Sequence, residues 1–78
     1  MNYISRFCHM ARDNARQARY HDLRARNYSG VQGERHRRFA VKYANEALAD
    51  LFQMRVEIEL AVVELKAQRA KEAMEVAA

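Results

Sequence analysis

The sequence has two glycines, Gly30 and Gly33, and no proline. Glycine and proline are the residues that most often interrupt helices, so the segment 28–33 is the one predicted break in the chain. Most other positions hold residues that favour helices. We therefore expect an all-α antiparallel hairpin: helix 1 over about residues 2–27, a loop over about 28–33 and helix 2 over about 34–76. Helix 2 begins between Gly30 and Glu34, where Ser29 and Gln32 have the spacing of a capping box.

The small size of the chain favours an additional source of stability. Seventy-eight residues form one domain, 1–78, near the size at which a single core barely offsets the entropy lost on folding. Cys8 is the only cysteine, so no intrachain disulfide forms; we expect it to be a small buried core residue in a reducing compartment. His21 and His36 show no ligand spacing, and no metal or cofactor is predicted. Oligomerisation is the remaining way to stabilise the domain.

Helix 1 is predicted to have one modest apolar stripe. Its large side chains lie near the N-terminus and its alanines lie towards the loop. Alanines allow close approach of another helix, so the hairpin should be tight near the turn. The stripe contains Ile4, Phe7, Cys8, Ala11, Ala15, Ala18 and Ala25.

Helix 2 carries two apolar stripes. The first stripe is Ala44, Leu48, Leu51, Ile58, Val62 and Leu65. The second stripe is Phe52, Val56, Leu60, Val63, Ala67, Ala70 and Met74. Together they cover more than half of the circumference, whereas a helix lying on a surface needs an apolar arc of about 100°. We expect helix 2 to be contacted from two sides.

The unequal lengths of the helices predict self-association. At 1.5 Å per residue, helix 2 would be ~65 Å long and helix 1 only ~39 Å, so helix 1 covers helix 2 only to about Glu59. The stretch Leu60–Leu65 would then project into water. A second copy, packed antiparallel as a four-helix bundle with coiled-coil-like contacts, would cover it. The predicted dimer interface is Leu51, Arg55, Ile58, Glu59, Leu60, Val62, Val63 and Leu65.

Arg55 and Glu59 interrupt the apolar surface of helix 2 four residues apart. They can form an intrahelical ion pair, or pair between two chains and fix the antiparallel register. An alternative fold has a break between Asn45 and Asp50, which gives a monomeric three-helix bundle. That region has neither glycine nor proline, so we favour the continuous helix.

Charge is divided unevenly along the chain. Residues 1–43 have ten basic and three acidic side chains, a net of +7, and residues 44–78 have four basic and seven acidic ones, a net of −3. Eleven of the fourteen basic residues are arginine, which favours bidentate contact with carboxylates or phosphates. On helix 2, Glu46, Asp50, Glu57 and Glu64 follow the narrow polar face. The candidate partner-binding residues are Arg12, Arg16, Arg19, Arg26, Arg35, Arg37 and Arg38.

These arginines have several interpretations. They can bind an acidic protein surface, contact nucleic-acid phosphates, pair with carboxylates of their own assembly, or be solvated. Tyr20, Tyr28 and Tyr43 can stack on bases near the loop. The interpretation we favour is that these three tyrosines close the hairpin.

The sequence has no motif that indicates catalysis, and we expect no enzyme activity, no catalytic residue and no small-molecule substrate. No apolar run approaches the roughly 18–20 residues that span a bilayer, and no signal-peptide pattern is present, so we expect a cytoplasmic protein without membrane contact. The favoured function is a regulatory or accessory homodimer that binds and modulates a protein partner, a role that fits a phage or mobile-element protein. The alternatives are a nucleic-acid-binding dimer and a structural assembly subunit.

Overall fold

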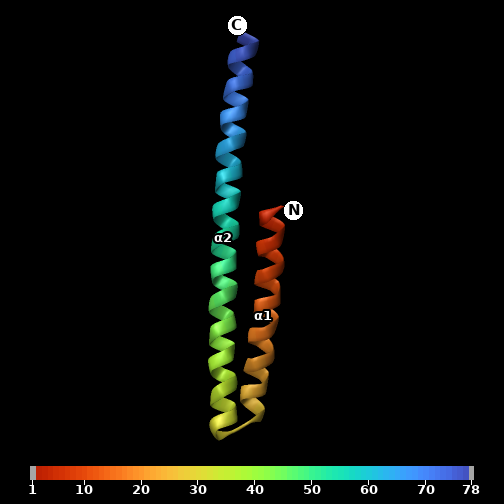
Figure 1. Cartoon of the computed structure of the whole chain (residues 1–78), viewed down its shortest axis with the longest axis vertical. Helices are drawn as coiled ribbons and strands as arrows, with labels where there is room; N and C mark the ends of the chain where they lie inside the picture. The colour runs from red at the N-terminus through yellow and green to blue at the C-terminus, as the bar shows by residue number, and fades with distance from the viewer. Residues whose placement is uncertain (1, 78) are drawn as a thin grey trace.

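The computed structural model describes residues 2–77, which form two antiparallel helices joined by a tight turn (Figure 1). Helix α1 is Tyr3–Asn27 and helix α2 is Gly30–Ala77, and there is no strand among these residues. The molecule is a rod of 73 × 16 × 14 Å, whose long dimension is the length of α2. The predicted all-α helical hairpin is therefore confirmed.

The break near Asn45 to Asp50, on which the three-helix alternative depended, does not exist. Helix α2 runs without interruption for 48 residues and contains this region as regular helix. The loop is shorter than the predicted 28–33, because α2 already begins at Gly30. Ser29 directly precedes α2 and Gln32 lies in its first turn, but neither capping-box hydrogen bond forms within residues 2–77.

At both ends of α1, nearby residues form hydrogen bonds with backbone groups of the helix. Asn2 is its N-cap: the side-chain Oδ1 accepts a hydrogen bond from the amide of Ile4 at 2.8 Å. At the other end, the amide of Tyr28 donates to the carbonyl of Arg24 at 3.1 Å, and Tyr28 takes an extended conformation that ends the helix. Arg24 and Arg26 lie in the last turn, where a positive charge interacts favourably with the negative end of the helix dipole.

The two glycines make the tight turn feasible for different reasons. Gly30 has φ +66°, a left-handed conformation that other residues rarely adopt. Gly33 is buried and lies against the end of α1: a Cβ atom there would meet the Tyr28 carbonyl oxygen and would lie 3.4 Å from the Ala25 oxygen. Gly33 therefore allows the backbone of α2 to approach the backbone of α1.

The two helices pack through one row of residues each, which together we call the hairpin interface. These residues are buried or half-buried and recur at alternating three- and four-residue steps, the spacing of a coiled-coil seam. In α1 the row is Ile4, Phe7, Ala11, Asn14, Ala18, His21 and Ala25, and in α2 it is Gly33, His36, Ala40, Tyr43, Ala47, Asp50, Met54 and Glu57. Most of these residues are small or polar, so the helices lie close together with few large apolar side chains between them.

The sequence-based assignment of faces was wrong at several positions. Asp50, expected on a polar face, lies in the hairpin interface with 9% of its surface exposed, and its Oδ2 accepts a hydrogen bond of 2.7 Å from Asn14 Nδ2. Glu57 is half-buried in the same row. Cys8, expected in the core, is exposed, as is Ala15, because both lie one position beyond the interface row.

Neither apolar stripe of α2 forms the hairpin interface. All residues of the first stripe are exposed, and from Ile58 to Ala77 every residue of α2 is exposed. Asn2, Tyr3 and Ile4 line a shallow hollow with Leu60, Ala61 and Glu64, so α1 reaches slightly beyond the expected limit at Glu59. Beyond this point α2 continues without an intramolecular neighbour (Figure 1).

Candidate interaction surfaces

The closed end of the hairpin contains a cluster of histidines and aromatic residues. His21 of α1 and His36 of α2 approach each other, with their Nδ1 atoms 2.9 Å apart. The ring of Tyr43 is stacked parallel to His21 at 5.6 Å, and Phe39 lies 5.1 Å from the same ring. Tyr28 is stacked on His36 at 5.7 Å. The cluster joins the two helices next to the turn.

The ionisation of His21 is affected by this environment. Partial burial, followed by repulsion from the nearby His36, lowers the pKa of His21 below its usual value of 6.5. The neutral form is therefore favoured in the folded hairpin. A neutral imidazole can donate from one ring nitrogen and accept at the other, which is what a hydrogen bond between two imidazoles requires.

Sequence reasoning missed this histidine pair, although a signal existed. His21 lies seven residues before Tyr28 and His36 lies seven residues after Ser29, so a tight antiparallel turn places them at the same end. Two histidines are fewer than a structural metal site requires. Within residues 2–77 no group of three or more histidine, cysteine or acidic side chains is placed to hold a metal ion.

The three tyrosines considered for base stacking are engaged within the hairpin. Tyr28 and Tyr43 lie against the two histidines, and the Arg24 guanidinium lies 5.2 Å from the centre of the Tyr20 ring. Arg24 also donates a 3.1 Å hydrogen bond to the Tyr28 hydroxyl. Attraction to Tyr20, and then this hydrogen bond, raise the pKa of Arg24 above its usual value. The contacts of Tyr28 and Tyr43 favour the prediction that the tyrosines close the hairpin, whereas Tyr20 contacts only its own helix and has 48% of its surface exposed.

Six of the seven candidate arginines form two groups in the structure. Arg12, Arg16 and Arg19 surround Ala15 on one side of α1, which we call the arginine flank. Arg35, Arg37 and Arg38 lie in the first turns of α2, where Glu34 is their neighbour.

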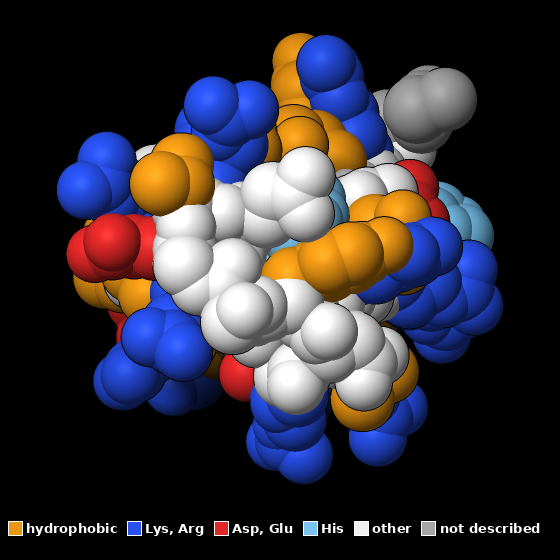
Figure 2. Space-filling model, turned by 90° about the horizontal axis from the view of Figure 1, so that it is seen from below, with side chains coloured by type: hydrophobic (Ala, Val, Ile, Leu, Met, Phe, Trp, Pro, Cys, Tyr) orange, Lys and Arg blue, Asp and Glu red, His pale blue; other side chains and the backbone are white. Residues whose placement is uncertain are grey.

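Basic side chains project around the rim of the turn end of the molecule, whereas acidic ones are few on that face (Figure 2). All seven candidate arginines are exposed. Arg26 alone among them forms an ion pair within residues 2–77, with Asp22 at 3.1 Å.

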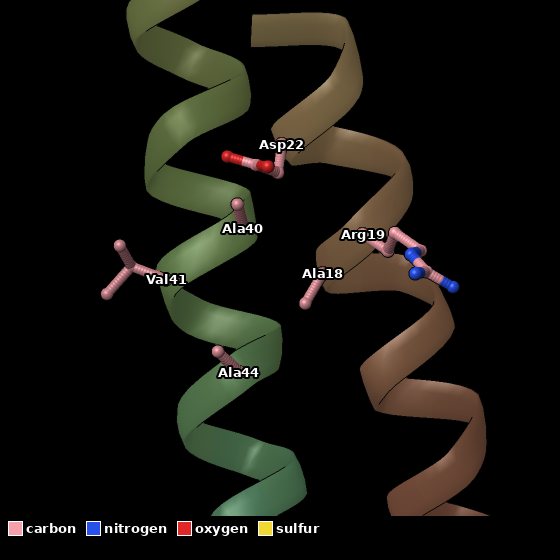
Figure 3. A pocket seen from close by; sticks show the side chains of 6 residues that line it. All are labelled: Ala18, Arg19, Asp22, Ala40, Val41 and Ala44. Carbon is pink, nitrogen blue, oxygen red and sulfur yellow. The ribbon is translucent and has the colours of Figure 1, made fainter.

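A shallow groove runs between the helices beside the arginine flank of α1. Ala18, Ala40 and Ala44 point into the space between the helices, while Arg19 and Val41, which also line the groove, point away from that space (Figure 3). Asp22 places one acidic group at the same groove. Small side chains on both helices make the groove, because they leave the space between the helices unfilled.

The predicted dimer-interface residues are all exposed. Leu51, Ile58, Val62 and Leu65 follow one line along α2, and Leu60 and Val63 lie on another side. Successive residues are rotated by about 100° about the helix axis, so these two sets of residues lie on different sides of α2. Arg55 and Glu59 form an intrahelical ion pair of 3.1 Å, with most of each side chain exposed.

In the described chain, 2–77, no helix combines the length and the apolar character needed to cross a membrane. No protein-family model matches the chain, and comparisons with curated proteins and with solved structures also gave no match.

Proposed function

We propose that the protein is a non-enzymatic helical homodimer that binds an acidic surface of a protein partner through its arginine-rich N-terminal half and modulates that partner. The observation that supports this most strongly is the arginine flank of α1. Arg12, Arg16 and Arg19 are exposed and form no ion pair with a carboxylate among residues 2–77. Six of the seven candidate arginines share this property, so their charges are available to another molecule.

The chemical character of the same flank favours a protein over a nucleic acid. An exposed apolar side chain, Leu23, accompanies the arginines on α1. Protein interfaces combine arginine with apolar residues, whereas nucleic-acid interfaces are more polar and more uniformly positive. The aromatic residues that would stack on bases are engaged with the histidines and Arg24.

The homodimer part of the proposal is supported by the exposed first stripe. Leu48 has 64% of its surface exposed and Val62 has 45%, and both lie in one line of aliphatic residues that no part of residues 2–77 covers. Burying a large aliphatic side chain contributes about 1.5–3 kcal/mol. Self-association is the arrangement that needs no other molecule to gain this free energy.

A paired charge-removal experiment tests the partner class. The variant Arg12→Gln/Arg16→Gln removes two positive charges from the arginine flank. The control Arg6→Gln/Lys42→Gln removes two exposed charges from the same half of the chain but outside this flank. We expect the wild-type protein and the control to retain one dominant protein from a nuclease-treated lysate, and the flank variant to lose it.

A second measurement addresses nucleic acid directly, using a generic DNA duplex and a single strand as fluorescent probes. We expect weak binding to both. Tight binding that falls steeply with salt, together with loss of the captured protein after nuclease treatment, would show that the arginines contact phosphates. That result would replace the proposed partner with nucleic acid.

A further inference from the structure

The groove and the first stripe form one continuous surface. Val41 and Ala44 line the groove, and Ala44 is also the first residue of the stripe that continues through Leu48 to Leu65. At three- and four-residue steps these positions follow one side of α2 for about seven helical turns. Most of this surface has α1 beside it, and only its end, from about Val62 to Leu65, extends past the beginning of α1.

The exposed area of the chain exceeds that of a compact monomer by more than a stable dimer interface buries. The solvent-accessible surface is 6658 Å² for a chain of 9.1 kDa. A compact monomer of this mass exposes roughly 4,900 Å², so this chain exposes an excess of roughly 1,800 Å². A stable interface buries about 800 Å² of each partner. The excess is therefore large enough for one such interface on each chain.

The distribution of charge decides between parallel and antiparallel pairing. Because α1 folds back along α2, the half of the rod near the turn (residues 8–53) has a net charge of +4 and the other half (residues 2–7 and 54–77) a net charge of 0. Parallel copies would therefore place two +4 halves side by side, and antiparallel copies would not. Like charges in proximity oppose association. The antiparallel arrangement also separates the two turn ends, where the basic side chains are concentrated (Figure 2).

Antiparallel pairing along the first stripe gives the projecting part of α2 a definite neighbour. If the stripe of one copy lies on the same stripe of the other, the two-fold axis lies near the middle of α2, at about residues 53–57. The segment 62–77 of one copy then lies level with residues around 36–50 of the other. These are the residues of α2 that form the groove with Ala18 and Arg19.

We propose that this groove is the binding site for the C-terminal segment of α2, residues 62–77, from a second copy of the chain in an antiparallel dimer. The inference rests on the proposed homodimer, keeps the antiparallel orientation expected from the sequence and adds the contact site. The small side chains of Ala18, Ala40 and Ala44 leave room for a third helix between the arginine flank and α2. Each copy supplies one groove and one C-terminal segment, so the dimer is closed.

Spin labels at the C-terminal end of α2 test the orientation. With Cys8→Ser as background, a label at Met74→Cys gives an interspin distance of ~50–60 Å in the antiparallel dimer, because two copies of about 19 residues of helix separate the labels. In a parallel dimer the distance is roughly 15–25 Å. A label at Gln53→Cys, near the axis, is the control and gives roughly 20–30 Å in either arrangement.

A pair of alanine substitutions tests the groove itself. Ala44→Lys places a charge in the groove, and Ala49→Lys places the same charge at an exposed position outside the groove and outside the stripe. We expect Ala44→Lys to weaken dimerisation at least tenfold and Ala49→Lys to leave it unchanged, with equal helix content by circular dichroism.

If light scattering shows a dimer but the labels at Met74→Cys are roughly 15–25 Å apart, the antiparallel orientation is overturned and the proposed homodimer stands. Equal affinities of the two lysine variants would overturn the groove as the contact site. A monomer by light scattering would overturn the homodimer itself, and this inference with it.

Discussion

Gly33→Ala is the substitution that most directly tests how closely the helices approach at the turn. An alanine in an exposed helix interior is more favourable than glycine by about 1 kcal/mol, and restriction of the unfolded chain adds to this. Gly33 is different because the added Cβ would meet the Tyr28 carbonyl oxygen and lie 3.0 Å from its carbon. Both are backbone atoms, so relief requires α2 to move away from the end of α1.

Overpacking of this kind costs about 1–3 kcal/mol, and here it also cancels the gain in helix propensity. We expect Gly33→Ala to lower the free energy of unfolding by about 1–2 kcal/mol, which corresponds to a fall in Tm of roughly 4–16 °C for a domain of this size. Thermal unfolding followed by circular dichroism, at one fixed protein concentration, measures the effect.

Two further variants separate the clash from general effects of substitution near the turn. Gln32→Ala changes an exposed neighbour in the same helical turn and should stay within about 0.5 kcal/mol of the wild type. Gly30→Ala has open space around its Cβ but a φ of +66°, and should be destabilised by about 1–2 kcal/mol through backbone strain alone. If Gly33→Ala instead raised Tm, the close approach of the two backbones would be refuted.

Three further predictions follow from the hairpin interface and its surroundings. Asp50→Ala removes the acceptor of the 2.7 Å hydrogen bond from Asn14 and should cost about 1–3 kcal/mol in urea unfolding; a neutral effect would show that the bond is unimportant. Burial and His36 lower the pKa of His21, so the unfolded chain binds more protons just below pH 6.5. The free energy of unfolding should therefore fall as the pH is lowered through 6.5, and His21→Phe should remove this dependence. Cys8 is exposed, so a thiol reagent should modify it equally fast in native buffer and in urea; strong protection in native buffer would contradict the structure.

Much of the architecture could be predicted because helix interruption has a strong local signal. The two glycines and the absence of proline located the turn, and the helix-forming composition gave two helices with a continuous second one. The structure confirms the hairpin and places the start of α2 at Gly30. The capping box failed as a local signal, because the left-handed Gly30 follows Ser29 directly.

The side of α2 that faces α1 could not be predicted from the apolar pattern. Apolar periodicity identifies the largest aliphatic residues, such as Leu48 and Val62, but α1 offers mostly small residues, and the ring of His21, opposite the turn-proximal half of α2. The helices instead pack through Ala47 and Asp50, whose signal is their spacing and not their hydrophobicity. The predicted stripe of helix 1 contains Ile4, Phe7, Ala11, Ala18 and Ala25 of the interface row, whereas on α2 the small and polar residues of the row form no apolar stripe, so only the α2 side of the hairpin interface was missed.

The candidate surfaces could be predicted only in part from the sequence. Arginine is exposed in most proteins, so the exposure of the arginine flank follows from composition. The groove depends on how two rows of alanines are aligned across the hairpin, and the histidine pair depends on the length of the turn. Both are properties of the register between helices, which no local segment encodes.

The central claim is that the exposed first stripe is a self-association surface. Sedimentation equilibrium tests it most directly, at roughly 100 µM protein, where a dimer with Kd near 1 µM contains little monomer. We expect a mass of twice 9.1 kDa for the wild type and 9.1 kDa for Ile58→Glu/Val62→Glu, which places two charges in the stripe. A wild-type mass of 9.1 kDa with full helix content would contradict the claim.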